Sequence, residues 1–402
     1  MPSGNTTAAV LQKASGNESK FLHLHFPGTG WNNQRQNLVL GVLLARLLNR
    51  SLIAPKHIAS NKHFERTRTH TDELVDTAYL NTLVPVSLRD GLRAHPGMFL
   101  NTAQCCDLSG EDVAQLRAAA AVYPTVHLQP MWGPSIPFFA GALESQVEVV
   151  AAFSTRREFA LCADEIIRHF GVVDALHLRA GDKDPMPLLD CEACGMRTNK
   201  STGFPFPTCT RAGLAMQFSD AIDCALAQGV VLPGNPLYVA TNLNAVQVSR
   251  ALNTTFAQRG AFEKMSHILS YLAEKGTPVL TWNDVISSGT TPASCSGIDL
   301  TSGYMVSIVE QYICAHAPGY YFAQFPSSWD ELVLWVRHVR GKSAGVEAGR
   351  WVEQLLLYWR WTRTTNRMYR DSVDGSTSHA VKLTDAHGKA QFTLPCRRCL
   401  GK

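Results

Sequence analysis

The chain has 402 residues, of which 45% are hydrophobic and 17% charged, and its formal net charge is +4. This length allows two domains with a large core, and the composition excludes a disordered protein. The mild positive charge suits an anionic small molecule. With no basic block, helix-turn-helix or zinc-finger spacing, nucleic acid is not an expected partner. No run of about 18 apolar residues could span a bilayer, so we expect membrane attachment only through an anchor absent from this chain.

The first half of the chain opens with a β-α-β unit. Residues 1–19 are small and polar, and we expect them to be disordered. Apolar patterns predict a strand over 20–26, a helix over 34–48 and a strand over 51–55. Less regular strands and helices follow near 98–101, 109–121, 125–129 and 154–170.

Strands and helices alternate again in the second half, which is typical of a parallel sheet. The predicted order is strand 172–179, irregular segment 183–211, helix 212–228, strand 237–241, helices 244–257 and 261–275, strand 278–282, helix 303–317, strand 319–325 and helix 328–340. We therefore predict an α/β fold of two Rossmann-like, doubly wound domains, over 20–171 and 172–345. Residues 346–402 are expected to hold one helix and a polar, irregular tail.

Two helix-start loops could each bind a phosphate group. The loop before the first helix contains Gly28, Gly30, Asn32 and Asn33. Its glycines allow close backbone approach, and its amides can bind hydroxyls or phosphate. Ser327-Ser328 offers hydroxyls and amides before the helix at 328–340. Each loop taken alone is equally compatible with ordinary capping.

The strand over 172–179 ends in His177-x-Arg179-x-x-Asp182. Because strand side chains alternate, His177 and Arg179 face the same side. They lie at the carboxyl end of the strand, where α/β sheets bind ligands. An arginine there is suited to a phosphate oxygen, although a simple Arg–Asp cap explains the same residues.

These motifs together resemble the GDP-fucose protein O-fucosyltransferase family. The run over 30–35, followed by Ala45-Arg46-Leu47-Leu48-Asn49-Arg50-Ser51, is similar to the opening of that family. His177-x-Arg179-x-x-Asp182 resembles the motif of the wider GDP-fucose transferases. Further similar segments follow in the same order, at Ala240-Thr241-Asn242, Val309-Glu310-Gln311-Tyr312-Ile313-Cys314-Ala315 and Ser327-Ser328.

The resemblance implies a GT-B fold, with the two domains facing across a cleft. It also implies inverting, metal-independent transfer of fucose from GDP-fucose to a hydroxyl of a protein Ser/Thr or a glycan, without a cofactor. Arg179 would stabilise the departing GDP, and Asn33 would lie near the fucose and the acceptor. The resemblance further implies a donor site made of His177, Arg179, Asp182, Gly28, Gly30, Asn32, Thr241, Asn242, Ser327 and Ser328.

Some residues depart from the family pattern. Where some members carry a carboxylate in the first loop, this chain has an amide, which cannot accept a proton. Glu310 and Asn242 stand where Asp is usual. The proton acceptor is therefore unassigned, and a non-catalytic GDP-sugar-binding protein is an alternative.

Two other readings involve metals. Asp182-x-Asp184 after a strand could be the metal site of a GT-A transferase. Cys191-x-x-Cys194 and Cys396-x-x-Cys399 could bind zinc. With Cys209 near the first pair, we instead expect a disulfide-braced loop within 183–211. His23 and His25 share one strand face, where a core or cleft role is favoured over metal binding.

Cysteine and glycosylation signals favour an oxidising compartment. The chain has 11 cysteines, and Asn-x-Ser/Thr sequons begin at Asn5, Asn17, Asn49, Asn199 and Asn253. We expect the lumen of the ER or Golgi. A cytoplasmic location is the alternative, because the first residues lack the apolar core of a signal peptide.

Overall fold

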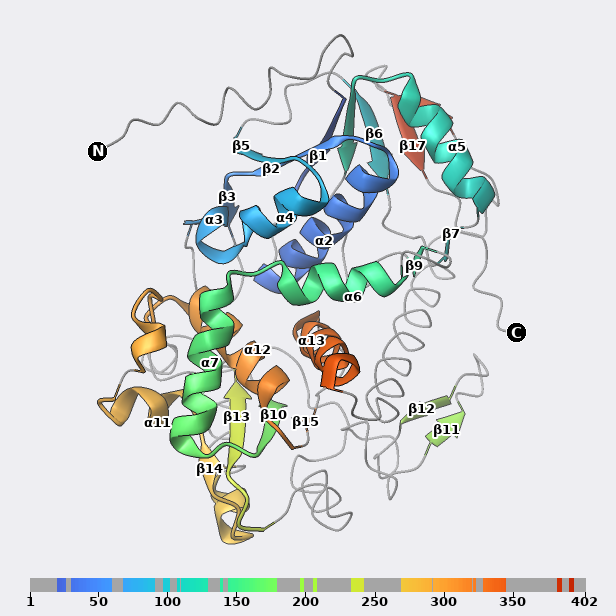
Figure 1. Ribbon diagram of the computed structural model, residues 1–402. Coiled ribbons are helices and arrows are strands. Elements are labelled where there is room, and N and C mark those ends of the chain that lie inside the picture. The colour runs from blue at the N-terminus through green and yellow to red at the C-terminus, as the bar shows by residue number, and fades with distance from the viewer. Residues whose placement is uncertain are drawn as a thin grey trace, which may run out of the picture.

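Two larger β-sheets, mainly parallel, and the helices packed on them form most of the described part of the chain (Figure 1). The computed structural model describes residues 20–26, 30–59, 68–90, 97–101, 107–108, 110–128, 138–139, 144–178, 196–198, 205–207, 233–241, 269–290, 292–319, 321–322, 328–344, 382–384 and 390–393. The predicted α/β class is confirmed. The partition at residue 172 and the cleft between two domains stay predictions.

The first sheet has the strand order β16-β17-β6-β8-β1-β2-β5. All neighbouring strands are parallel except the β16–β17 pair. The strands are β1 (Phe21–Leu24), β2 (Ser51–Pro55), β5 (Val86–Arg89), β6 (Met98–Asn101), β8 (Thr125–Leu128), β16 (Lys382–Thr384) and β17 (Ala390–Thr393). The chain adds β2 and β5 on one side of β1, and β8 and β6 on the other.

Helix α2 (Trp31–Leu47) is buried around nearly its whole circumference. It contacts β1 and β2 on one side and α6 (Glu144–Phe153) on the other. A Cβ at Gly41 would lie 3.3 Å from side-chain atoms of Leu24 and of Leu52, so the absent side chain brings the helix close to the sheet. Each buried leucine of such a helix contributes roughly 1.5–3 kcal/mol.

The second sheet has the order β14-β13-β10-β15 and is parallel throughout. Its strands are β10 (Asp174–Leu178), β13 (Leu237–Thr241), β14 (Val279–Leu280) and β15 (Tyr321–Phe322). Helix α12 (Gly303–His316) packs on β10 and β13, and α13 (Ser328–Ala344) packs on α12, α6 and α2. The α13 helix therefore joins the two halves.

Helix α7 (Arg157–Phe170) precedes β10 but packs mainly on α12. It ends at Gly171, whose φ of 64° is a left-handed cap that glycine adopts without strain. A disulfide joins Cys162 of α7 to Cys295 of the 3₁₀ turn η3 (Ala293–Cys295). The sequence patterns did not predict this bond.

Shorter elements connect these layers. They are β3 (His57–Ala59), β4 (Arg68–His70), α3 (Thr71–Leu74), α4 (Thr77–Leu83), β7 (Asp107–Leu108), α5 (Gly110–Ala121), β9 (Phe138–Phe139), β11 (Met196–Thr198), β12 (Pro205–Pro207) and α11 (Trp282–Ser287). Among the described helices, none combines the length and apolar character needed to cross a membrane.

The C-terminal tail corrects one expectation. We expected residues 346–402 to end in an irregular tail, but β16 and β17 lie in this tail, and β17 pairs in parallel with β6. The backbone pairing of an existing sheet edge thus outweighs the weak local signal of a polar tail. Outside the described residues lie the predicted helices over 212–228 and 244–257 and the helix expected over 347–361. The cysteine-containing loop over 183–211 also lies outside them, apart from β11 and β12.

Candidate functional site

The end of β10 and the start of α13, which are distant in sequence, meet at His177. This side chain lies on β10 and is 5% exposed. Its Nδ1 lies 2.8 Å from Oδ1 of Asp330 in the first turn of α13, and its ring stacks on Trp329, with ring centroids 4.0 Å apart. The end of β10 is therefore held against the beginning of α13.

Asp330 is fully buried, so its hydrogen bonds define its chemistry. The Tyr321 hydroxyl on β15 donates to the same Oδ1 that contacts His177. An ionised carboxylate only accepts hydrogen bonds, so with Asp330 ionised this contact needs a hydrogen on Nδ1 of His177. The other oxygen, Oδ2, is buried and has no partner among the described residues. Burial raises the pKa of Tyr321 well above its usual value, so this phenol stays a donor.

Gln311 of α12 connects this group to the first sheet. Its Nε2 donates to Oδ1 of Asn32 at 2.7 Å and to the main-chain oxygen of Trp329 at 3.2 Å. Asn32 lies in the first turn of α2, two residues after Gly30, whose carbonyl accepts from the amide of Asn33. The loop after β1 and the start of α13 thus meet on one glutamine. Gln311 is 3% exposed, and its Oε1 has no partner in the described part of the chain.

A buried carboxyl group supports the neighbouring strand end. Glu310 accepts a hydrogen bond from the hydroxyl of Tyr238 at 3.0 Å and another from the backbone of Thr241. Burial raises the pKa of Glu310 to about 8, although both hydrogen bonds act in the opposite direction. Thr241, a predicted donor-binding residue, is therefore anchored through its backbone at the carboxyl end of β13.

The segment between α6 and α7 is clamped to the same helix. The hydroxyl of Tyr312 donates to the carbonyl of Ala152 at 3.1 Å and is also bonded to the hydroxyl of Thr155. From the first half, Arg35 donates through Nε to the Ser154 hydroxyl at 3.1 Å. Burial lowers the pKa of this arginine, and Tyr312 partly restores it. The neighbouring residues Gln311 and Tyr312 of α12 thus hold the Asn32 loop and the segment between α6 and α7, which we call the crossover.

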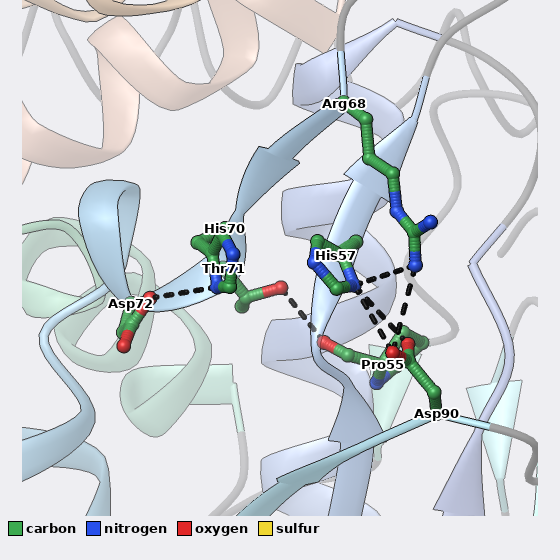
Figure 2. A network of polar contacts seen from close by, with 7 residues as sticks. All are labelled: Pro55, His57, Arg68, His70, Thr71, Asp72 and Asp90. Carbon is green, nitrogen blue, oxygen red and sulfur yellow. Dashed lines mark hydrogen bonds and ion pairs between the residues drawn. The ribbon is translucent and has the colours of Figure 1, made fainter.

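A second polar group, the edge cluster, consists of His57, Arg68, His70, Asp72 and Asp90 (Figure 2). It follows the carboxyl ends of β2 and β5, on the β3–β4 hairpin and the start of α3. Nη2 of Arg68 lies 2.8 Å from Nδ1 of His57, and the Asp90 carboxylate lies 3.2 Å from the same nitrogen. The rings of His57 and His70 are 4.3 Å apart. The cluster ties the hairpin to the sheet.

One nitrogen of His57 cannot serve both neighbours at once. Its Nδ1 accepts from Arg68 when it carries no hydrogen, and it donates to Asp90 when it carries one. The Thr71 hydroxyl also donates to the carbonyl of Pro55 at 2.7 Å, which fixes the other end of the hairpin (Figure 2). Sequence patterns missed this cluster because its members come from three short elements, β3, β4 and α3, and from the residue after β5.

The predicted site residues are only partly placed. The structure brings His177 and Asn32 together through Gln311, Trp329 and Asp330, and it places Gly30, Asn33 and the backbone of Ser328 at the two helix starts. Asn33 is half-buried, and its main-chain oxygen accepts from the Asn37 side chain. The predicted residues outside the described part of the chain are Gly28, Arg179, Asp182, Asn242 and Ser327, and Asp184 is also outside it.

The metal alternatives remain untested. Within the described residues, no group of His, Cys, Asp or Glu is arranged to hold a metal ion. The residues proposed for such sites, Asp182, Asp184 and the two Cys-x-x-Cys pairs, lie outside that part.

Sequence reasoning missed Asp330 and Tyr321. Asp330 directly follows the Ser327-Ser328-Trp329 run, and an acid in the first turn of a helix is too common to signal a site. Gln311 was included in a segment of family resemblance, but its contact with Asn32 spans 279 residues and has no local signature.

Comparisons with known proteins give distant likenesses. No protein-family model and no curated protein matches this chain. It is similar to the solved structure of POFUT1 in complex with GDP-fucose, at 12% identity and a TM-score of 0.43, over 80% of this chain and 96% of the other. A structure of POFUT1 in complex with GDP gives 13% identity and a TM-score of 0.43, over 81% and 98%.

The fucosyltransferase NodZ from Bradyrhizobium is also similar, at 13% identity and a TM-score of 0.39, over 80% of this chain and 93% of the other. These likenesses are too distant to carry a functional conclusion, which therefore has to come from the residues of this chain.

Proposed function

We propose that this chain transfers fucose from GDP-fucose to a hydroxyl group of a protein or a glycan. One observation carries the proposal. Three segments that resemble the fucosyltransferase family, and that lie far apart in sequence, meet in one hydrogen-bonded group. They contribute Asn32, His177 and the start of α13 at Ser328, joined through Gln311 and Asp330.

The chemistry of these segments suits a nucleoside diphosphate. The first turn of α13 presents backbone amides next to a strand end, an arrangement that binds phosphate groups. Arg179 follows His177 by two residues and, if the strand alternation continues, faces the same side. We assign Arg179 to the departing β-phosphate, where a fixed positive charge stabilises the developing negative charge. Ser327 and Ser328 would donate to the same diphosphate.

Asn33 and His177 take supporting roles in this proposal. The amide of Asn33 would orient the fucose and the acceptor hydroxyl, without taking the proton. His177, held by Asp330, would contact the donor or fix the strand end that carries Arg179. We further propose an inverting reaction that needs no metal, in a GT-B arrangement with the donor between the two sheets. Gly28, Asp182, Thr241 and Asn242 complete the donor site.

We also propose a location in the lumen of the ER or Golgi. The Cys162–Cys295 disulfide supports it, because such bonds persist in oxidising compartments.

Calorimetric titration of the purified protein with GDP-fucose, GDP and UDP in the presence of EDTA tests the proposal. We expect guanine-selective binding that Arg179→Ala weakens at least tenfold, while the exposed Arg157→Ala binds as the unmodified protein does. Transfer or hydrolysis of the donor, monitored by GDP release, then separates an enzyme from a binding protein. Failure to bind both GDP and GDP-fucose would refute the proposal, and binding only with added metal would favour the GT-A alternative.

A further inference from the structure

A basic pocket lies at the amino-terminal ends of β1 and β2 in the first sheet, whereas the candidate site lies at the carboxyl-terminal ends of the strands. It has a volume of about 480 Å³ and is lined by the last turns of α2 and α5 and by the residues just before β1 and β2. These positions are at the amino ends of parallel strands, whereas Asn32 follows a carboxyl end. In Figure 1 α5 lies at the upper right and the second sheet at the lower left. The pocket is thus separate from the site proposed for GDP-fucose.

The residues that line the pocket carry charge of one sign. Lys20, Arg46, Arg50 and Arg117 are among them, and no Asp or Glu is. The carboxyl ends of α2 and α5 partly neutralise these cations, but each helix end is equivalent to only about half a negative charge. The side chains that line the cavity therefore carry positive charge and no carboxylate, which makes the cavity attractive to an anion.

Hydrogen bonds to main-chain oxygens hold Lys20, Arg50 and Arg117 in place. Arg50, which is 4% exposed, donates to the carbonyls of Phe21, Pro124 and Tyr123 at 2.8–3.1 Å, and its Nε has no partner in the described part of the chain. Lys20 donates to the carbonyl of Ala121 at 3.2 Å.

Arg117 uses only Nε for its bond to the carbonyl of Leu47, at 3.1 Å. Within the described part of the chain its two terminal nitrogens make no hydrogen bond, so they remain as donors in a planar fork. A fork of this kind matches the oxygens of a tetrahedral oxyanion.

We propose that this pocket binds the phosphate group of a small molecule. The pre-positioned donors lose little side-chain freedom when an anion enters, and the volume is ample for a pyrophosphate or a small phosphate ester. A soluble phosphate ester and a lipid headgroup share this chemistry. We assign the site to a soluble ligand, because its cations line a cavity between helix ends. The inference does not depend on fucosyl transfer.

Calorimetry with inorganic pyrophosphate, at low salt and without phosphate buffer, tests the site. We expect saturable binding that weakens at least tenfold in Arg117→Gln and in Arg46→Gln, and that falls with added salt. The matched control is Arg157→Gln, an exposed arginine at the start of α7, which is expected to bind as the unmodified protein does. Circular dichroism checks that each variant is folded. Arg50 is left intact because its hydrogen bonds to four main-chain oxygens, those of Phe21, Pro124, Tyr123 and Ala120, are structural.

Two outcomes would overturn the inference: no saturable pyrophosphate binding, or equal affinity in the unmodified protein and both pocket variants. Vesicles containing phosphatidic acid form a second arm. Failure of the vesicles to compete with pyrophosphate supports the soluble ligand, and efficient competition overturns that assignment. GDP titrations of Arg117→Gln keep the two sites apart, because a donor site at the opposite edge retains its GDP affinity in this variant.

Discussion

Replacing Glu310 with Gln is expected to make the protein more stable at neutral pH. The glutamine keeps an oxygen that can accept from Tyr238 and from the Thr241 backbone. It also removes a buried carboxyl group whose ionisation destabilises the folded state. Burial raises the pKa of Glu310 from its ordinary value of 4.5 to about 8. The folded state therefore retains a proton over a pH range in which the unfolded chain has released it.

The sign and the size of the effect of Glu310 on the free energy of unfolding follow from proton linkage. Below pH 4.5 both states hold the proton, so the raised pKa has no effect on stability. Between pH 4.5 and about 8, ionisation favours the unfolded state by about 1.4 kcal/mol for each pH unit. At about pH 7.5 the accumulated loss is about 3 to 4 kcal/mol, a large fraction of the stability of a typical domain.

Urea unfolding of the unmodified protein and Glu310→Gln, compared between about pH 5 and about pH 7.5, measures this difference. The variant is expected to gain about 3 kcal/mol on the unmodified protein over that interval. Glu73→Gln, which changes an exposed carboxylate on α3, serves as the control and should follow the unmodified protein. Stability curves for Glu310→Gln and the unmodified protein that stay parallel across this pH range would refute the reasoning.

Three further predictions concern the contacts that join distant segments. Replacing both Cys162 and Cys295 with Ala removes a bond that spans 133 residues and should cost about 2 to 5 kcal/mol in thermal or chemical unfolding. Unchanged stability would mean that η3 is held by packing alone. Gln311→Ala and Asn32→Ala are expected to be coupled by about 0.5 to 1.5 kcal/mol in a double-mutant cycle, and simple additivity would contradict the bridge. Asp90→Asn should accelerate hydrogen exchange of the β3–β4 hairpin only severalfold, because an exposed ion pair is worth less than about 1 kcal/mol; exchange at the original rate would show that the carboxylate does not hold the hairpin.

Periodic segments were predictable from the sequence, and short elements were not. The predicted strand over 51–55 matches β2, and the predicted helix over 303–317 matches α12 within a residue. Both have long or clearly apolar patterns that burial dictates. The β3–β4 hairpin and β5 have too few residues for a periodic signal, and β17 takes its conformation from the free edge that β6 offers.

The candidate site was predicted as a set of strand ends and helix starts, but without its connecting atoms. The alternation of β10 placed His177 at a ligand-facing edge, and the glycine loop placed Asn32 at a helix start. Neither pattern indicates that Gln311 joins the loop to α13, because a hydrogen bond between residues 279 positions apart depends on how the two sheets pack. The partner of His177, Asp330, depends on the same packing.

Helix α12 organises the candidate site through three consecutive polar residues. Successive helix positions are rotated by about 100°, so neighbours along α12 face different parts of the protein. Glu310 reaches Tyr238 and the end of β13, Gln311 reaches the Asn32 loop and α13, and Tyr312 reaches the crossover at Ala152 and Thr155. All three are buried, where an unmade hydrogen bond is costly. Changes at these positions that remove one of these hydrogen bonds should therefore alter the geometry of the site.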